Sequence, residues 1–595
     1  MRLLSIVLAF LGVFGAATQL HHTAAILQSP REFPTDAESF HVVNVIVAGA
    51  TGDLAAKYLW VALFRLALEG QSTFKRTFRF FAGASDTLER GSAWIETFFD
   101  KTFAERVCGA IGIEQGQAST AQIKCLEFLE TEFKPNVEYA PLRTEGHYRN
   151  LGSRLMETND QTEEGRIVYL AIPPQFFLQS CKMIHRHLRP ARREIGSADP
   201  FLRVVVEKPF GRDLQSAHEL ATRLRALYKN EELYVMDHYA GKPVVHSLRN
   251  YFQINAAALH PIWNSQRIRD IHIEMTETST LENRVHYFDS AGIIRDIVVN
   301  HLQLLLNVAV TPSFESSIFS ASIPPNEFAR KLHDAQLRFV KALKRPSLQT
   351  SKSFFVAQYD EYAVHYEDEM DKHIAQSNHF TPTAAMIELT SSLDAWKNTT
   401  FHLAAAKATA KRLLAITATF KDGLFSSIEA QACTFTVIIQ RELNADFRHS
   451  HQIEWSCDIE KLLPELQIPV GWEYLSPDDH RILIPIEANG FEAAEWELGD
   501  EPSAYDILLR EVARGSMEHF ADLDEIEAAW ALWTPVVNAA ESMVSSDSET
   551  NEQHEADLSH GTERKHASYP AGTSPWKQFY HSRSQNVAPS PREEL

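Results

Sequence analysis

Beyond residue 40, the apolar pattern begins with a run of mostly β-branched residues, HVVNVIVA at 41–48, which is typical of a buried strand. A glycine turn follows, GATGDL at 49–54, and Leu59, Leu63 and Leu66 then recur at the spacing of one helix face. Glycines let a backbone approach a pyrophosphate, and a helix N-terminus favours negative charge. A strand, a glycine turn and a helix in this order predict the first unit of a dinucleotide-binding fold.

The same alternation of strands and helices continues along the first part of the chain. Residues 79–82, 166–172 and 201–206 have the composition of buried strands, and residues 214–228 have helical periodicity. Strands that alternate with helices indicate a parallel, doubly wound sheet whose site lies at the carboxyl ends of the strands. We therefore predict an α/β Rossmann-like dinucleotide-binding domain over residues 41–236.

From residue 237 the pattern changes. Residues 268–278 alternate between apolar and polar side chains, and residues 413–420 and 434–440 also have strand character, with helical segments between them. Alternation of this kind is typical of antiparallel sheets that have one face on a core. We predict a second, α+β domain over residues 237–540 with a large, mostly antiparallel sheet.

Both ends of the chain carry features of a protein of the secretory pathway. Residues 3–14, LLSIVLAFLGVF, form a short apolar run between Arg2 and small residues, which predicts a signal peptide over residues 1–24 rather than a membrane span. The chain ends in REEL, which is similar to a retention signal of the endoplasmic reticulum. We therefore expect the endoplasmic reticulum lumen as the location. Residues 541–595 are expected to be a largely disordered acidic linker and C-terminal tail.

Composition and charge exclude some classes of partner. The chain has 595 residues, of which 44% are hydrophobic and 23% charged, as in a globular enzyme with more than one core. Its formal net charge is −21, and because phosphate backbones need basic surfaces, we expect no nucleic-acid partner. After the first residues, no apolar run approaches the ~18 residues of a membrane helix. An anionic substrate must be held by a local basic pocket.

Cysteine usage gives no sign of a metal site. None of the five cysteines has zinc-site spacing, so no metal is expected. An oxidising lumen would allow one disulfide, with Cys108 and Cys125 as one candidate pair, and would leave an odd thiol. One glycosylation sequon, Asn398-Thr399-Thr400, agrees with secretion.

The hexapeptide DHYAGK at 237–242 concentrates groups that can bind phosphate. His238, Tyr239 and Lys242 supply an imidazole, a phenol and an ammonium, and the Asp237 carboxylate can orient a second imidazole. A polar turn after an edge strand would explain the same residues equally well. The neighbouring motifs have to decide between the two interpretations.

A second group of polar residues lies in an apolar helical segment, GIIRDIVVNH at 292–301. Hydride transfer from a carbon that bears a hydroxyl needs a base for the hydroxyl proton, and an imidazole oriented by a carboxylate is suited to this task. His301 and Asp237 could form that pair, although a core histidine is the ordinary alternative. On a continuous α-helix Asp296 and His301 stand about 140° apart, so they share a cleft only if Asp296 lies at the helix start.

Further charged residues are candidates by position alone. Lys208 follows a predicted strand, Glu277 closes an alternating one, and Lys407 and Arg412 lie in an alanine-rich segment. Each of them alone is more typical of an ordinary surface residue.

With these motifs assembled, the chain resembles the glucose-6-phosphate dehydrogenase family, and most closely its endoplasmic-reticulum branch, the hexose-6-phosphate dehydrogenases. The resemblance covers residues 44–580, and the pairing of DHYxGK with GIIRDxxxNH is its most specific feature, whereas EKP alone also occurs in other Rossmann sugar oxidoreductases. The shared segments, in family order, are GATGDLA, KYLW, LAIPP, EKPFGRD, DHYAGK, IWN, YFDSAGIIRD, NH, QY, TPT and AAWALWTP.

The resemblance implies oxidation of glucose 6-phosphate, or another hexose 6-phosphate, at C1 to the lactone, with hydride transfer to NADP or NAD, a reaction of the pentose phosphate pathway. It implies His301 as general base, oriented by Asp237. The other implied site residues are Lys208 for sugar and cofactor, His238, Tyr239 and Lys242 for the phosphate, Lys407 and Arg412 for charge, Glu277 and Asp296 for sugar hydroxyls, and Gly49, Thr51, Gly52, Asp53 and Leu54 for the cofactor.

The chain departs from the family pattern at several positions. Val235 stands where arginine is usual, Pro243 where an acidic or amide residue is usual, and Val299 where glutamine is usual. Ala404, Ala405 and Ala406 replace a segment that contains a glycine, which removes backbone freedom. These departures put the substrate range in doubt.

Cofactor choice is open for a separate reason. Ser85 and Asp86 follow the second predicted strand where an arginine for the 2′-phosphate of NADP is expected, and the register of Arg90 is uncertain. NADP is the expected cofactor, with NAD as the alternative.

The sequence also allows two other functions. One alternative hypothesis is a degenerate relative that binds the cofactor without turnover. The other is a dehydrogenase of unphosphorylated sugars. Too few residues follow Pro535 for the lactone-hydrolysing domain of the endoplasmic-reticulum branch, so we expect a dehydrogenase part only. The resemblance also implies a homodimer or homotetramer.

Overall fold

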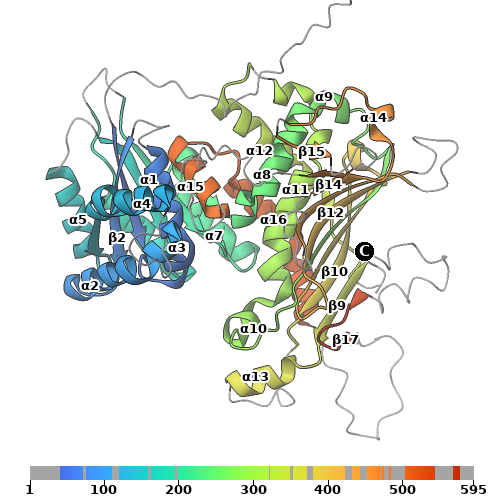
Figure 1. Ribbon diagram of the computed structural model, residues 1–595. Coiled ribbons are helices and arrows are strands. Elements are labelled where there is room, and N and C mark those ends of the chain that lie inside the picture. The colour runs from blue at the N-terminus through green and yellow to red at the C-terminus, as the bar shows by residue number, and fades with distance from the viewer. Residues whose placement is uncertain are drawn as a thin grey trace, which may run out of the picture. The chain divides into compact units, whose positions relative to one another are not determined.

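The part of the chain that can be described comprises most of both expected domains (Figure 1). The expected signal peptide, the REEL terminus and most of the expected tail lie outside it. The computed structural model describes residues 41–70, 76–109, 119–157, 163–193, 198–320, 322–348, 353–370, 380–421, 432–441, 452–469, 471–474, 481–483, 503–542 and 567–576.

The first domain is built on a parallel sheet, which within the described residues has six strands in the order β3-β2-β1-β4-β5-β6. This order is that of a doubly wound dinucleotide-binding fold, so the predicted fold class is confirmed for this part of the chain. The strands are β1 His41–Ala48, β2 Arg76–Ala84, β3 Val137–Pro141, β4 Glu163–Leu170, β5 Phe201–Glu207 and β6 Leu233–Met236.

Helices follow these strands and cover the sheet. Alternate residues of β1 face opposite sides, so Val45 belongs to one hydrophobic cluster and Ile46 to another, and both are fully buried. Burial on both faces explains the continuous β-branched runs of the sequence. The helices are α1 Trp60–Glu69, α2 Leu88–Phe98, α3 Ala104–Cys108, α4 Thr120–Phe128, α5 Glu145–Glu157, α6 Phe177–His187 and α7 Leu214–Arg225.

The second sheet is larger and mixed. Within the described residues it has eleven strands, in the order β15-β16-β14-β13-β12-β7-β11-β10-β9-β17 with β8 beside β10, and only the β7–β11 and β9–β17 pairs are parallel. The predicted mostly antiparallel sheet is therefore confirmed. Its strands are β7 Ile268–Thr276, β8 Leu343–Lys344, β9 Phe354–Tyr359, β10 Ala384–Ser391, β11 Thr400–Ala406, β12 Leu413–Phe420, β13 Thr434–Arg441, β14 Gln452–Trp455, β15 Glu473–Tyr474, β16 Arg481–Leu483 and β17 Ala567–Tyr569.

Helices α8, α11, α12 and α16 lie along one side of the second sheet (Figure 1). Buried aromatic and aliphatic residues of these four helices belong to the same hydrophobic cluster as buried residues of its strands. The helices that follow β6 in the chain are α8 Pro243–Ile254, α9 Ala256–Leu259, α10 Val285–Ile293, α11 Gln303–Ala309, α12 Pro325–Ala342, α13 Tyr362–Met370, α14 Ile459–Leu462, α15 Ala504–Arg514 and α16 Leu523–Glu541. Of these, α15 shares its buried residues with the core of the first sheet.

One part of the expected tail is ordered. Strand β17 pairs in parallel with β9, and the indole of Trp576 donates a hydrogen bond of 2.8 Å to Glu274 Oε1 on β7. Residues 567–576 are therefore part of the second sheet, which is a correction to the expectation of a largely disordered tail in that stretch. The boundaries expected at residues 236/237 and 540/541 stay predictions.

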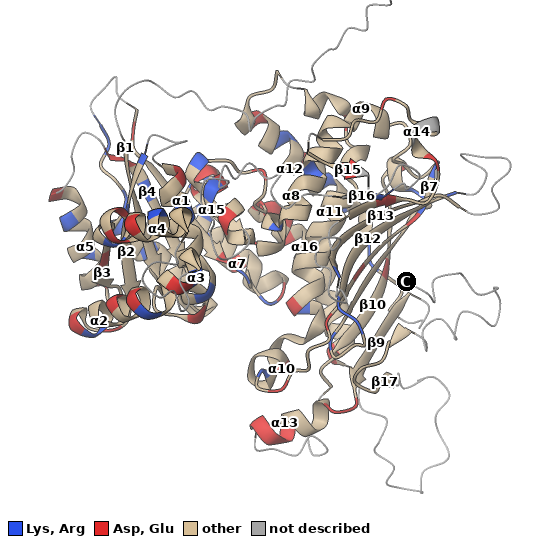
Figure 2. Cartoon of the chain, viewed as in Figure 1, with Lys and Arg blue, Asp and Glu red and all other residues tan. Residues whose placement is uncertain are grey.

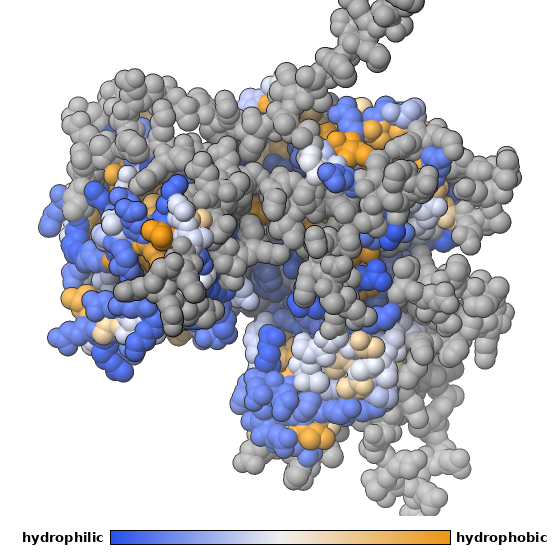
Figure 3. All heavy atoms as spheres, viewed as in Figure 1, coloured by the Kyte–Doolittle hydropathy of each residue, from blue (hydrophilic) through white to orange (hydrophobic). Residues whose placement is uncertain are grey.

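Charged residues of both signs are interspersed over the helices of the two sheets, with an acidic cluster on α13 (Figure 2). In the view of Figure 3, apolar atoms form separate patches among hydrophilic ones. None of the helices in the described part of the chain is both long and apolar enough to cross a membrane.

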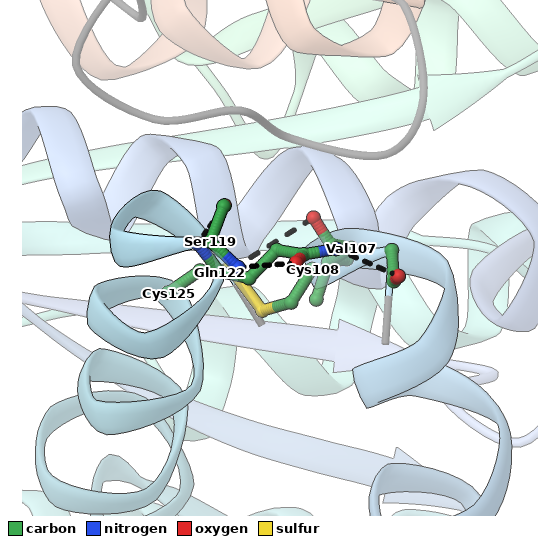
Figure 4. Close-up of a disulfide and its surroundings, with 6 residues drawn as sticks. Val107, Cys108, Ser119, Gln122 and Cys125 are labelled. Carbon is green, nitrogen blue, oxygen red and sulfur yellow. Dashed lines mark hydrogen bonds between the residues drawn. A yellow bond between two sulfur atoms is a disulfide. The ribbon is translucent and has the colours of Figure 1, made fainter. Parts of the chain in front are cut away.

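Two disulfides join described residues. Cys108, at the end of α3, is bonded to Cys125 in α4, next to the capping box of Ser119 and Gln122 at the start of α4 (Figure 4). The candidate pair is thus confirmed, but a second bond, Cys433–Cys457, was not expected from the sequence. Cys181 is the odd thiol and is buried.

We expect the Cys108–Cys125 bond to stabilise the first domain. Replacing both residues by alanine releases a closed loop with a sequence separation of 17, which should lower the free energy of unfolding by about 3 kcal/mol. Urea denaturation measures this loss. Cys181→Ala, which breaks no disulfide, is the control and should cost less, so an equal cost in the two proteins would contradict the prediction.

Candidate active site

The centre of the site is a hydrogen bond between Asp237 and His301. His301 Nδ1 lies 2.7 Å from Asp237 Oδ1 and 2.9 Å from Oδ2, and the imidazole is 3% exposed. Because an ionised carboxylate can only accept, Nδ1 carries the proton and Nε2 presents its lone pair. Burial alone would raise the pKa of Asp237, but the interaction with His301, including its hydrogen bond, and the nearby charge of Lys208 hold that pKa well below its usual range.

His301 is neutral in this environment. Burial lowers the pKa of His301, and although the charge of Asp237 opposes this, the charge of Lys208 adds to it. A neutral imidazole with an oriented tautomer can accept a proton at Nε2. The pair can therefore work as a general base.

Asp237 is fixed by the loop that it begins. Its Oδ1 accepts a hydrogen bond of 2.9 Å from the backbone N–H of Tyr239, as an N-cap of the 3₁₀ helix at His238–Gly241. The ring of Tyr239 packs on the ring of His301 with centroids 3.8 Å apart. The same hexapeptide thus fixes the position of the Asp237 carboxylate and supplies the ring that packs on one face of the His301 imidazole.

His301 is presented by a π-helix, Ile294–Leu302. Gly292, the next-to-last residue of α10, has φ of +63° and interrupts the helical backbone just before this segment. In a π-helix, residues five apart are hydrogen-bonded neighbours, so Asp296 and His301 lie on one face. Asp296 is also in the first turn of this helix, which was the condition set above for Asp296 and His301 to share a cleft. The segment is therefore a π-helix and not the continuous α-helix considered from the sequence.

Lys208 approaches the same imidazole from the first domain. It follows β5 directly, and its Nζ lies 2.5 Å from His301 Nε2, the nitrogen that faces away from Asp237. The preceding Glu207 is buried and accepts a hydrogen bond from the hydroxyl of Tyr169. Burial raises the pKa of Glu207 to about 7.

A second cluster of charge lies at the ends of β7 and β11. Lys407 is 4% exposed, forms a short ion pair with Glu277, and lies 3.4 Å from Asp296 Oδ2. Its backbone carbonyl accepts a hydrogen bond of 2.7 Å from the hydroxyl of Tyr569, in β17. Lys407 thus holds two carboxylates in place, whereas the sequence had assigned it to general charge at the site.

The remaining cations gather around an amide that the sequence did not indicate. Lys242 Nζ lies 3.4 Å from Gln440 Oε1 and 4.8 Å from the centroid of the Tyr239 ring. With its amide turned, Gln440 accepts hydrogen bonds from Arg412 Nε at 3.0 Å and Nη2 at 2.7 Å. Lys242 and Arg412 therefore lie at the same amide, whose oxygen accepts from Lys242 in one orientation and from Arg412 in the other. A phosphate has enough oxygens to accept from both cations at once.

Burial sets the protonation of this cradle, which we define as His238, Tyr239, Lys242, Arg412 and Gln440. Burial lowers the pKa of Lys242 to about 8, and the charge of Arg412 adds to this effect. Burial likewise lowers the pKa of His238 to about 3, so its imidazole is neutral near neutral pH. At neutral pH the cradle offers two cations and a neutral imidazole.

The residues expected to bind the cofactor form the turn after β1. Gly49 has φ of +92°, and a Cβ there would lie 2.1 Å from the carbonyl oxygen of Ala171, so only glycine fits. Thr51 and Leu54 are half-buried and Gly52 and Asp53 are exposed, with Asp53 paired to Lys57 at 3.1 Å. A close turn at the carboxyl end of a central strand, before a helix, fits a dinucleotide pyrophosphate.

The second strand settles the register that was uncertain. β2 ends at Ala84, Ser85 and Asp86 follow, and Arg90 lies exposed in the first turn of α2. These three residues lie at the carboxyl end of the strand beside β1.

The family departures lie beside the site but do not distort it. Val235 and Val299 line a cavity of about 100 Å³ that Lys208 and Asp237 also line. Ala404 to Ala406 lie in regular register with β7, so no glycine is needed there. The positive φ of this stretch, +50°, belongs to Ala408.

Two residues of the site, Gln440 and Tyr505, were not identified from the sequence. Gln440 is 198 residues from Lys242 and lies in a strand where nothing marks it as functional. Tyr505, at the start of α15, stacks on His238 with centroids 6.0 Å apart. The alternation of β13 could have placed Gln440 on a sheet face, but no local signal indicated Tyr505.

Comparisons with known proteins cover both sheets. Residues 46–247 match the family described as glucose-6-phosphate dehydrogenase, NAD binding domain, and residues 251–574 match glucose-6-phosphate dehydrogenase, C-terminal domain. The GDH/6PGL endoplasmic bifunctional protein of Oryctolagus cuniculus is 28% identical over 504 residues, which are 84% of this chain and 59% of that protein. The protein of the same name from Homo sapiens is 27% identical over the same shares. The chain thus spans 59% of the length of these two relatives.

Other similar proteins come from plants and bacteria. The chloroplastic glucose-6-phosphate 1-dehydrogenase of Spinacia oleracea is 26% identical over 536 residues, which are 87% of this chain and 80% of that protein. A solved glucose-6-phosphate dehydrogenase in complex with its substrate glucose-6-phosphate has a TM-score of 0.66 at 23% identity and covers 93% of this chain and 100% of its own. Glucose-6-phosphate 1-dehydrogenase from Mycobacterium avium has a TM-score of 0.60 at 19% identity, with coverages of 93% and 99%. These structures share the fold.

The cradle predicts a pH-dependent affinity for inorganic phosphate. Since Lys242 has its pKa lowered to about 8, it is an ammonium below that pH and neutral above it, so phosphate affinity should be retained at pH 7 and lost as the pH rises through about 8. Calorimetric titration with phosphate between about pH 7 and 9 measures this loss. Lys242→Met should bind about tenfold more weakly at pH 7 and show no fall in affinity as the pH rises through about 8, whereas Lys182→Met, an exposed lysine of α6, should behave as wild type. A pH-independent affinity of the wild type would contradict the prediction.

Proposed function

Because this chain belongs to the glucose-6-phosphate dehydrogenase family, we propose that it oxidises glucose 6-phosphate, or hexose 6-phosphates more widely, at C1 to the lactone, with NADP or NAD as hydride acceptor. The observation that carries the proposal is the Asp237–His301 pair, with a neutral imidazole whose Nε2 faces Lys208. An oriented neutral imidazole is what removal of a hydroxyl proton requires.

The proposed reaction begins at His301. Nε2 accepts the proton of the C1 hydroxyl while C1 loses its hydrogen as hydride, and the C1–O bond becomes the carbonyl of the lactone. The proton makes His301 an imidazolium, which the Asp237 carboxylate stabilises across Nδ1. Lys208, beside Nε2, places an ammonium next to the oxygen that loses its proton.

The other residues position the sugar. Glu277 and Asp296 accept hydrogen bonds from sugar hydroxyls, and Lys407 holds both carboxylates at fixed places. The cradle takes the phosphate, whose oxygens accept from Lys242 and Arg412 together, whereas the single Gln440 oxygen serves only one of these cations at a time. Carboxylates near the base and cations at the far end give a hexose 6-phosphate one orientation.

The cofactor is held by the turn after β1. When bound, NADP or NAD supplies the hydride acceptor. Gly49, Thr51, Gly52, Asp53 and Leu54 take the pyrophosphate, and Lys208 contacts both cofactor and sugar. Asp86 can accept from ribose hydroxyls and Arg90 can pair with a 2′-phosphate, so the two residues favour NAD and NADP respectively.

We place the protein in the endoplasmic reticulum lumen, as a homodimer or homotetramer. Two disulfides support an oxidising compartment. The similarity to endoplasmic bifunctional proteins is consistent with that location.

The catalytic prediction concerns His301. With glucose 6-phosphate and either NADP or NAD, the wild type should form reduced cofactor, and His301→Asn should lower kcat at least about a hundredfold because no base remains. Absorbance of the reduced nicotinamide gives the rates, and circular dichroism shows that the fold is kept.

His260→Asn is the matched control, since His260 is a part-buried histidine bonded to the Pro312 carbonyl at 3.3 Å. It should retain wild-type kcat. No oxidation of any hexose phosphate by the wild type would reject the proposed function, and full activity of His301→Asn would reject the base.

The luminal location predicts a glycan on Asn398. This residue is exposed, with φ of +77°, on the turn before β11. The turn lies at the opposite end of β11 from Lys407, roughly 20 Å away at about 3.3 Å per residue, so a glycan leaves the site open.

Expression in a eukaryotic secretory host should give a chain whose mass falls on treatment with an N-glycosidase. Asn398→Gln and Thr400→Ala should each abolish the change in mass, because each removes the sequon. A wild-type chain with no glycan would contradict the luminal location.

A further inference from the structure

Helix α15, which comes late in the sequence, contacts both α1 of the dinucleotide-binding domain and the hexapeptide at 237–242. It packs on α1 through a buried ion pair, Arg65 Nη1 to Asp506 Oδ2 at 3.2 Å, between residues 441 apart (Figure 1). A second pair joins Arg510 Nε to Glu69 Oε2 at 2.8 Å. Since breaking a buried pair leaves an uncompensated charge, the position of α15 on α1 is strongly specified.

The first turn of α15 meets the hexapeptide at 237–242. A Cβ on Gly241 would lie 2.2 Å from the carbonyl oxygen of Ala504 and 2.6 Å from the side chain of Leu508. Only glycine permits this approach. The loop that carries His238 is therefore in direct contact with a helix that is anchored to the dinucleotide-binding domain.

Tyr505 extends this contact to the His238 ring. Its own ring, 7% exposed, stacks on His238 at 14° between planes and on Tyr58 with centroids 5.5 Å apart. The other ring neighbours of His238 are Tyr239 and His301, at centroid distances of 4.8 and 5.0 Å. Among the described residues no hydrogen bond holds the His238 side chain, so ring packing alone sets its orientation.

Orientation matters for His238 because its imidazole is neutral. A neutral imidazole binds an anion through one directed N–H, unlike an ammonium, which donates in three directions. A turn of the ring would move that N–H away from the phosphate. A side chain that holds the His238 ring in one orientation therefore contributes to the affinity for the phosphate end of the substrate.

We propose that Tyr505 is a positioning residue, whose ring holds the His238 imidazole in the orientation that binds the phosphate of the sugar. The proposal rests on the proposed function for the identity of the ligand. Tyr505 acts through His238, so it should influence binding of the phosphorylated substrate and leave proton removal at His301 untouched.

The test compares Tyr505→Leu with Tyr505→Phe. Loss of the aromatic ring should raise KM for glucose 6-phosphate about three- to tenfold, with kcat and KM for the cofactor within about twofold of wild type. Tyr505→Phe keeps the ring and should restore the wild-type KM. Tyr366→Leu, a buried tyrosine of α13, is the control for loss of a buried ring and should leave KM unchanged.

A double-mutant cycle separates positioning from general packing. If Tyr505 acts through His238, Tyr505→Leu should not raise KM further in a His238→Ala protein. An equal increase in both backgrounds would overturn the proposal, and so would an unchanged KM in Tyr505→Leu or a parallel change in kcat and cofactor KM.

Calorimetric binding of glucose 6-phosphate and of inorganic phosphate gives the same comparison without turnover. A wild type that binds glucose 6-phosphate but does not oxidise it would reject the proposed function, while weaker binding by Tyr505→Leu than by Tyr505→Phe would still support positioning. Equal affinities of these two variants would overturn the positioning role whether or not the wild type is active. A wild type that binds neither ligand would overturn it as well.

Discussion

The hydrogen bond between Asp237 and His301 is the constraint on which the site depends. It joins the end of a parallel strand in the first domain to a π-helix packed against the second sheet, between residues 64 apart. Both partners are buried, so the carboxylate and the imidazole each need the other to offset desolvation. Any shift of one sheet relative to the other would strain this bond. The geometry of this hydrogen bond and the packing of the two domains therefore depend on each other.

Charge is balanced locally around that bond. Glu277 and Asp296 are held by Lys407, and Asp237 by His301 with Lys208 nearby, so each carboxylate has a cation or an imidazole as partner. Lys242 and Arg412 both lie at a neutral amide, that of Gln440. Because the carboxylates are paired locally, a chain with a net charge of −21 can still have a positively charged pocket for a dianion. Through His238 and Tyr239, whose rings contact the ring of His301, the cradle also adjoins the Asp237–His301 pair.

Features that depend on short stretches of sequence were predictable. Parallel strands in β-branched runs, the glycine turn at Gly49 and the hexapeptide with Asp237 are local patterns, and the pairing of Asp237 with His301 followed from chemistry and family resemblance. The proximity of Asp296 to His301 was predictable only conditionally, because helical winding changes which residues share a face. Tyr505 could not be predicted, since a contact with so distant a part of the chain leaves no local trace. Gln440 lies opposite Leu414 in the strand paired with β12, but nothing in its own strand marks it as functional. Strand β17 was missed because a three-residue strand after a polar, acidic stretch carries no periodicity.

The departures from the family pattern have different physical meanings. In β11 the alanines occupy regular strand positions, so loss of a glycine there costs no backbone freedom that the fold uses. Val235 and Val299, by contrast, place apolar walls beside Lys208 and Asp237 around a small cavity. Apolar walls lower the local dielectric and strengthen the interaction between the charges that remain. The base should therefore depend more on Asp237 and Lys208 than it would with polar groups in those two places. The altered positions leave the hydrogen bond between Asp237 and His301 intact, which supports the proposed oxidation over a binding protein without turnover.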